Sequence, residues 1–112
     1  MANTERLLVI QKLRTAREAV GAARSDPKLT DEARADLYVL WSTIDRVEGV
    51  LILEEIKDRV DALAADAKKL KDVADEMASD VKKLAGVADL VDKAADALAT
   101  FVKIAGMAAT LA

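Results

Sequence analysis

The second half of the chain carries a heptad repeat of apolar residues. Steps of three and four residues alternate from Leu53 to Ala112, and each of the eighteen stops is apolar. Such a repeat places one continuous apolar stripe along a helix, and other helices have to cover it. We call this stripe the seam. Its positions are Leu53, Ile56, Val60, Leu63, Ala67, Leu70, Ala74, Met77, Val81, Leu84, Ala88, Val91, Ala95, Leu98, Val102, Ala105, Ala109 and Ala112.

Composition agrees with helices packed on helices. Apolar residues make up 53% of the chain but aromatic residues only 3%. Alanine supplies much of the apolar total, and it favours helices over strands. With 112 residues, the chain is long enough for one core. We therefore expect an all-α fold in a single helical domain over residues 1–112.

A first helix is predicted over residues 4–24. It carries an apolar stripe at three and four residue steps, formed by Val9, Leu13, Ala16, Val20 and Ala23. The only proline, at position 27, follows Ser25 and Asp26, so residues 25–29 are predicted to form a loop between antiparallel helices.

A second helix is predicted to begin at residue 31. Thr30 is a suitable N-cap, and the two acidic residues after it favour the positive end of the helix dipole. The apolar stripe of this helix does not match the phase of the seam, which shifts by two residues within residues 49–53. Such a shift indicates a change of partner, a bend or a discontinuity.

Two arrangements of the seam remain open. In the first, residues 31–112 form one very long helix, because the heptad phase of the seam continues from Leu53 onward without interruption across residues 79–87. That helix would be on the order of 120 Å long and would need a second chain, giving an oligomeric coiled-coil-like assembly with the first helix packed antiparallel on it. In the second, a break at residues 79–87, near Gly86, lets residues 88–112 fold back into a helical bundle.

The C-terminal residues 97–112 carry a single charge, Lys103. A helix that is apolar on all sides is either buried in a core or in contact with a membrane. For the membrane interpretation the apolar segment extends from residue 94 to 112. Its candidate contact residues are Leu98, Phe101, Val102, Ile104, Met107 and Leu111.

Several kinds of chemistry are excluded or unsupported. The chain has no Cys and no His, so thiolate and imidazole sites are excluded. It has no Gly-rich phosphate loop and no nucleophile motif. The net charge of −3 without a strong basic patch argues against nucleic acid. We therefore expect no enzyme activity, no catalytic, cofactor-binding or metal residues, no cofactor and no small-molecule substrate.

Acidic residues occur on helical faces but do not form a convincing site. Asp89, Asp92 and Asp96 share one face, with Lys93 four residues after Asp89, which is typical of a solvated face with an intrahelical ion pair. Glu54, Glu55 and Asp58 lack the histidines of helical di-metal sites. Both groups are therefore interpreted as surface charge.

The sequence thus favours a non-catalytic scaffold or assembly subunit. It would act by self-association or by binding a helical protein partner. The residues expected to form the contact are Leu53, Ile56, Val60, Leu63, Leu70, Met77, Val81, Leu84, Val91, Leu98 and Val102. The alternative is a membrane-active helical protein, pore-forming or membrane-remodelling, that inserts its C-terminal segment. The start of the chain does not resemble a secretory signal, so a cytoplasmic location is the default, with membrane association or signal-less secretion as alternatives.

Overall fold

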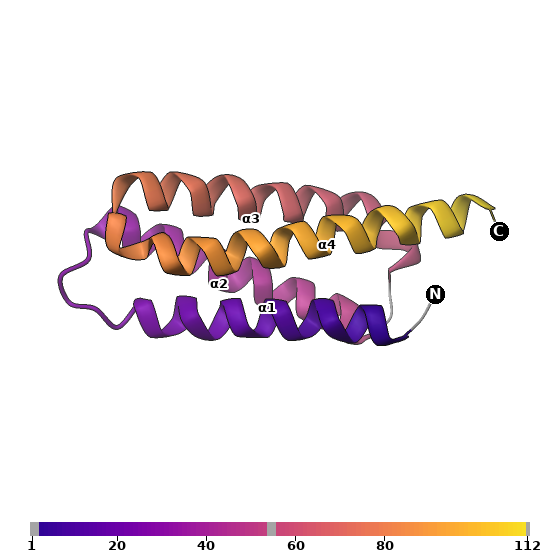
Figure 1. Ribbon diagram of the computed structural model, residues 1–112, viewed down its shortest axis with the longest axis horizontal. Coiled ribbons are helices and arrows are strands. Elements are labelled where there is room, and N and C mark those ends of the chain that lie inside the picture. Colours follow the sequence, from indigo (N-terminus) through magenta and orange to yellow (C-terminus); the bar gives the residue numbers. More distant parts are fainter. Residues whose placement is uncertain (1–2, 54–55, 112) are drawn as a thin grey trace.

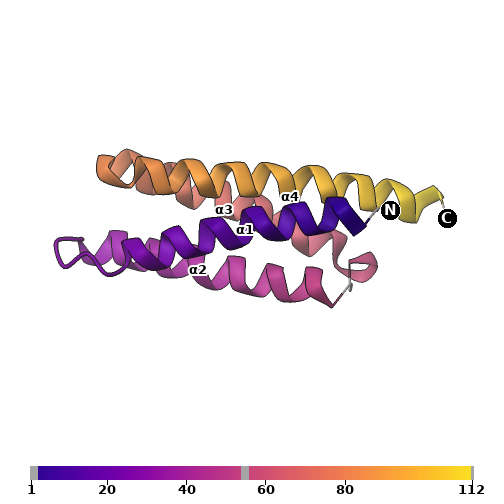
Figure 2. The ribbon, with the colours of Figure 1, turned by 60° about the horizontal axis from the view of Figure 1, so that its bottom comes forward.

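The computed structural model describes residues 3–53 and 56–111. Within them four helices alternate in direction along one long axis (Figure 1): α1 (Asn3–Ala23), α2 (Asp31–Ile52), α3 (Val60–Asp80) and α4 (Ala85–Leu111). Short 3-10 helices, η1 (Lys57–Arg59) and η2 (Lys82–Leu84), precede α3 and α4. Each helix packs on the next, and α1 also packs on α4, as Figure 2 shows. The predicted all-α class is confirmed, and the arrangement is an antiparallel helical bundle.

The turn between α1 and α2 is held by short side chains that bind backbone groups. An Asp26 carboxylate oxygen accepts a hydrogen bond from the Lys28 backbone N–H at 2.8 Å. The Thr30 hydroxyl oxygen accepts one from the Ala33 backbone N–H at 3.1 Å, which confirms the predicted N-cap. Asp26 also binds the Lys83 ammonium at 2.6 Å. This ion pair joins the first turn of the chain to the last one, between α3 and α4.

The continuous helix over residues 31–112 is wrong, because the chain breaks twice. Helix α2 ends at Ile52, and α3 ends at Asp80, where Val81 is extended with φ −131° and ψ 95°. The second break falls in the interval 79–87 predicted as the alternative. The molecule measures 51 × 19 × 18 Å, less than half the length of the single helix. Folding back allows one chain to cover its own seam, which a lone long helix cannot do.

The core lies along the axis of the bundle and takes residues from all four helices. Helix α1 contributes Leu13 and Val20, and α2 contributes Leu37, Leu40 and Ile44, each with 0% exposure. These residues belong to the stripes that the three and four residue spacing predicts. The two N-terminal helices therefore cover α3 and α4 with the faces expected of them.

Candidate functional site

The seam residues predicted to bind a partner line the interior of the bundle. Seven of them are at most 4% exposed: Leu63, Leu70, Met77, Leu84, Val91, Leu98 and Val102. Ile56, Val60 and Val81 are half-buried and pack against the same core. Leu53 differs, because it follows the end of α2 and is 68% exposed. In this fold the seam is covered by the chain itself, and a partner would have to bind elsewhere.

The candidate membrane contacts divide into buried, exposed and undescribed residues. Leu98, Phe101 and Val102 are at most 3% exposed, whereas Ile104 is 44% exposed. Met107 and Leu111 lie outside the side chains that the structure describes. In the described ranges, no helix combines the length and the apolar character needed to cross a bilayer.

A groove with a volume of about 550 Å³ runs between α1 and α4. Its apolar lining includes Leu8 from α1 and Ala97, Phe101 and Ile104 from α4. Phe101 is 3% exposed, so it belongs mostly to the core, whereas Leu8 is 52% and Ile104 44% exposed. Large apolar side chains that stay exposed beside a hollow are typical of a binding surface.

A second hollow of about 280 Å³ continues the groove along the same two helices. It is lined by Gln11 and Thr15 from α1 and Leu90 from α4. Lys12 and Lys93 line both hollows, so the two meet at these residues. We call the combined feature the α1/α4 groove. The two helices are antiparallel, so residues near the start of α1 face residues near the end of α4 (Figure 1).

The charged side chains that line the groove from α4 already form ion pairs, whereas those from α1 form none within the part of the chain that the structure describes. On α4, Lys93 binds Asp89 at 3.0 Å, and Asp96 binds Lys71 of α3 at 2.9 Å. On α1, Glu5 and Lys12 make no ion pair or hydrogen bond with their side chains in residues 3–53 and 56–111. The α1 side of the groove therefore presents one acid and one base that remain available to a partner.

Asp92 is a half-buried carboxyl group, although its spacing in the sequence predicts a solvated face. Burial raises the pKa of Asp92 from 3.8 to about 6, and the hydrogen bond to Asp75 and repulsion from it act in the same direction. Lys71 opposes the pKa shift and Asp96 adds to it. The Asp89–Lys93 pair predicted on the same face is present. The carboxyl groups of Asp92 and Asp75 meet between α3 and α4, so Asp92 keeps its proton to a higher pH than an ordinary aspartate.

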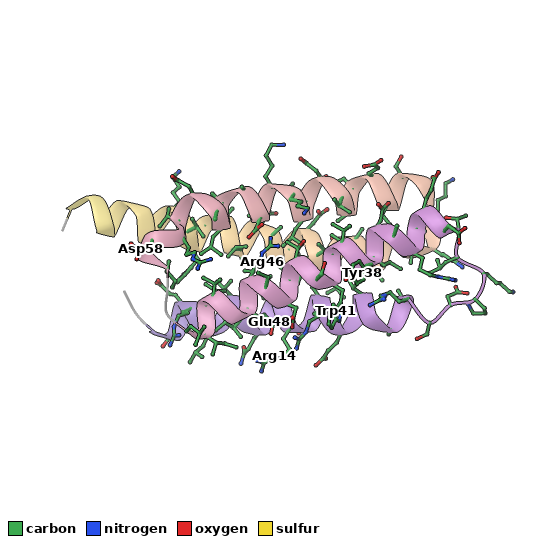
Figure 3. The ribbon with its side chains drawn as sticks, turned by 180° about the vertical axis from the view of Figure 1, so that it is seen from behind. Arg14, Tyr38, Trp41, Arg46, Glu48 and Asp58 are labelled. Atoms are coloured by element: carbon green, nitrogen blue, oxygen red, sulfur yellow. The ribbon has the colours of Figure 1, made fainter. Side chains whose placement is uncertain are left out.

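Glu48 is a second buried carboxyl group, between α1 and α2. Its side chain is 4% exposed, with Arg17 Nε at 3.3 Å and Arg14 Nε at 3.7 Å (Figure 3). Arg17 also binds Asp45 at 2.9 Å. Burial raises the pKa of Glu48, and the two arginines oppose that rise. The ion pairs tie α1 to α2, although Glu48 Oε1 accepts no hydrogen bond within the part of the chain that the structure describes.

Neither carboxyl group forms part of a metal site that the structure can define. In the described ranges, no group of three or more acidic side chains lies close enough to hold a metal ion. Comparison with protein-family models, with curated proteins and with solved structures found no match to this chain. The α1/α4 groove is therefore the candidate site, on its geometry alone.

Proposed function

We propose that this protein is a non-catalytic assembly subunit that binds a helix through the α1/α4 groove. The observation that supports the proposal most directly is the exposure of Leu8 and Ile104 beside a groove of about 550 Å³. A groove of this kind accepts the apolar stripe of an amphipathic helix, as in other helix-in-groove complexes. Glu5 and Lys12 would add charge contacts at its edge.

The groove is a better candidate surface than the seam because it needs no unfolding. Using Leu70 or Leu98 for a contact between chains would expose side chains that are 0% exposed in the bundle. Exposing each of them to water would cost about 2 kcal/mol before any partner is gained. Leu8 and Ile104, in contrast, are already in contact with water, so covering them is favourable from the start.

The test compares a groove variant with a matched control. Leu8→Glu combined with Ile104→Glu places charge in the groove, and Tyr38→Glu changes another exposed residue, 55% exposed, on α2. Each tagged chain is expressed in cells of its source organism and crosslinked there to the proteins that it binds. The recovered proteins are then purified, and each is titrated against the wild type and both variants. We expect the groove variant to lose at least about tenfold in affinity and the control to keep it. Equal binding by both variants, with unchanged circular dichroism, would refute the groove.

A second candidate function is membrane activity through α4, suggested by the apolar residues at one end of the bundle. Leu7, Leu8, Ile52, Leu53 and Ile104 are each at least 44% exposed, and the ends of α2 and α4 lie beside the start of α1 (Figure 1). Leu98, Phe101 and Val102 are buried, so insertion would require α4 to leave the bundle.

Flotation with neutral and anionic liposomes, beside a sample without lipid, tests this second function. Full-length protein that rises with the vesicles supports membrane activity. Protein that stays at the bottom with both kinds of vesicle rejects it, because binding would then lack even a surface contact.

A further inference from the structure

We infer that the partner in the α1/α4 groove is a second copy of this chain, packed antiparallel about a two-fold axis that passes between Leu8 and Val9. The inference rests on the proposed function and names the partner of that same groove. In such a dimer α1 faces α1 of the second copy and α4 faces α4. Both copies use the same surface, as a two-fold interface requires.

The charges on the α1 side of the groove are complementary under this two-fold axis. Glu5 and Lys12 are seven residues apart, or about two helical turns, so both lie on the side of α1 that lines the groove. A two-fold axis midway between them exchanges their positions, so that Glu5 of each copy meets Lys12 of the other. The dimer would contain two such ion pairs. Both side chains are available, because within residues 3–53 and 56–111 neither makes an ion pair.

The same two-fold axis also covers the exposed apolar residues of the groove. It passes beside Leu8, which is 52% exposed, so Leu8 of one copy packs near Leu8 of the other. Phe101 lines the same groove, and Ile104 lies less than one turn further along α4. The contact is therefore apolar at its centre and charged at its edges, which is the usual composition of a specific interface.

The end of α4 continues beyond the start of α1 (Figures 1 and 2). Its last residues, 107–111, are Met-Ala-Ala-Thr-Leu and carry no charge. In the antiparallel dimer this end of α4 lies alongside the second hollow of the other copy, the one lined by Thr15 and Leu90. With a two-fold axis parallel to the helices, this end of α4 would have no neighbour in the other copy, so the antiparallel arrangement gives the longer contact.

The contact area predicts a weak dimer. The two copies overlap by roughly 30 Å along the helices and by at most 19 Å across them. The interface then covers roughly 600 Å² of each chain, less than the ~800 Å² of a standard complex. We therefore expect dissociation in the micromolar range.

The experiment is a charge exchange measured by sedimentation equilibrium, at roughly 5 to 500 µM protein, a range that brackets the expected affinity. The samples are the wild type, Glu5→Lys, Lys12→Glu, the double variant, and an equal mixture of the two single variants. Each single variant creates two like-charge contacts and should weaken the dimer by about tenfold or more. The double variant restores both pairs and should recover the wild-type constant. The mixture should form a heterodimer. Lys69→Glu, an exposed change on α3, is the matched control.

Two results would overturn the inference. If the wild type stays monomeric up to 500 µM, a second copy of the chain is not the partner. A dimer whose double variant fails to recover has another geometry, since Lys12 would meet Asp96 if the copies were parallel. Circular dichroism of each variant shows that the bundle is intact. Neither result decides the proposed function, which is tested separately by the Leu8 and Ile104 variant against partners recovered from cells.

Discussion

At the scale of single residues, ionisation of Asp92 lowers the stability of the folded bundle. Its pKa of about 6 in the folded chain exceeds its ordinary value of 3.8, so the folded chain binds more protons between these two pH values. Proton binding by Asp92 therefore favours folding most below pH 4. This contribution of Asp92 to the stability is lost as the pH rises to 6. Above pH 6 the cost is constant. A shift of about two pH units corresponds to about 3 kcal/mol, and partial exposure to solvent reduces that value.

We expect Asp92→Asn to remove this pH dependence, because an amide cannot be ionised beside Asp75. The variant should be about 1 to 2 kcal/mol more stable than the wild type at pH 7 and nearly equal to it at pH 4. Urea unfolding at several pH values between 4 and 8 measures the difference. Asp89→Asn, at an exposed residue paired with Lys93, is the control. A gain of the same size at pH 4 and pH 7 would contradict the account.

We expect a different result for Glu48, because Arg17 and Arg14 partly offset the cost of burying its carboxylate. Arg17→Leu leaves the buried carboxylate with only the more distant Arg14, so we expect a loss of about 2 kcal/mol. In a Glu48→Leu background the same change should cost only about 0.5 kcal/mol, since only the exposed pair with Asp45 is then lost. A double-mutant cycle by chemical unfolding measures both costs. Equal costs in the two backgrounds would show that Glu48 does not depend on Arg17.

At the scale of elements, the sequence predicts the helices well and their ends poorly. The apolar spacing identifies the inward faces of α1 and α2, and Thr30 marks the start of α2. No glycine turn or proline marks the breaks after Ile52 and Asp80, because folding back is driven by covering the seam rather than by local backbone preference. The heptad period itself does not distinguish the two arrangements. Helices paired within one chain need the same inward stripe as helices paired between chains.

The candidate site could not be predicted from the sequence either, because it depends on how distant helices pack together. Leu8 lies in the predicted first helix, but whether it borders a groove depends on where α4 packs, about ninety residues later in the chain. The pairing of Asp75 with Asp92 likewise joins two helices whose break and relative orientation are set by tertiary packing. The spacing of Asp89 and Lys93, in contrast, lies within one helix, and that ion pair was predicted.

Two leucines of the seam, Leu53 at its start and Leu70 in its interior, are expected to contribute differently to stability. Leu70 is 0% exposed and packs among the four helices, so Leu70→Ala should cost about 2 to 5 kcal/mol. Leu53 is 68% exposed, so Leu53→Ala should change stability by no more than about 0.5 kcal/mol. Urea unfolding of the two variants, which make the same chemical change, gives the comparison. Similar losses would mean that Leu53 is buried, as one continuous coiled coil requires.

At the scale of the whole molecule, length separates the alternatives that the sequence leaves open. The bundle is 51 Å long with a Cα radius of gyration of 14.3 Å. Two bundles that overlap by roughly 30 Å in an antiparallel dimer would reach about 70 Å. A parallel dimer would be wider but hardly longer than one chain, and a coiled coil of continuous helices would exceed about 100 Å.

Small-angle X-ray scattering over a concentration series therefore gives three distinguishable results. We expect a maximum dimension near 51 Å plus a hydration layer in dilute samples, because the folded chain covers its own seam. It should rise to about 70 Å in the concentrated ones as the antiparallel dimer forms. The Glu5→Lys variant is the control, since it should keep the shorter dimension at concentrations where the wild type lengthens. A dimer that widens without lengthening would place the two copies parallel. A dimension above about 100 Å at every concentration would mean that α2, α3 and α4 join into one helix, and that the seam is covered by another chain.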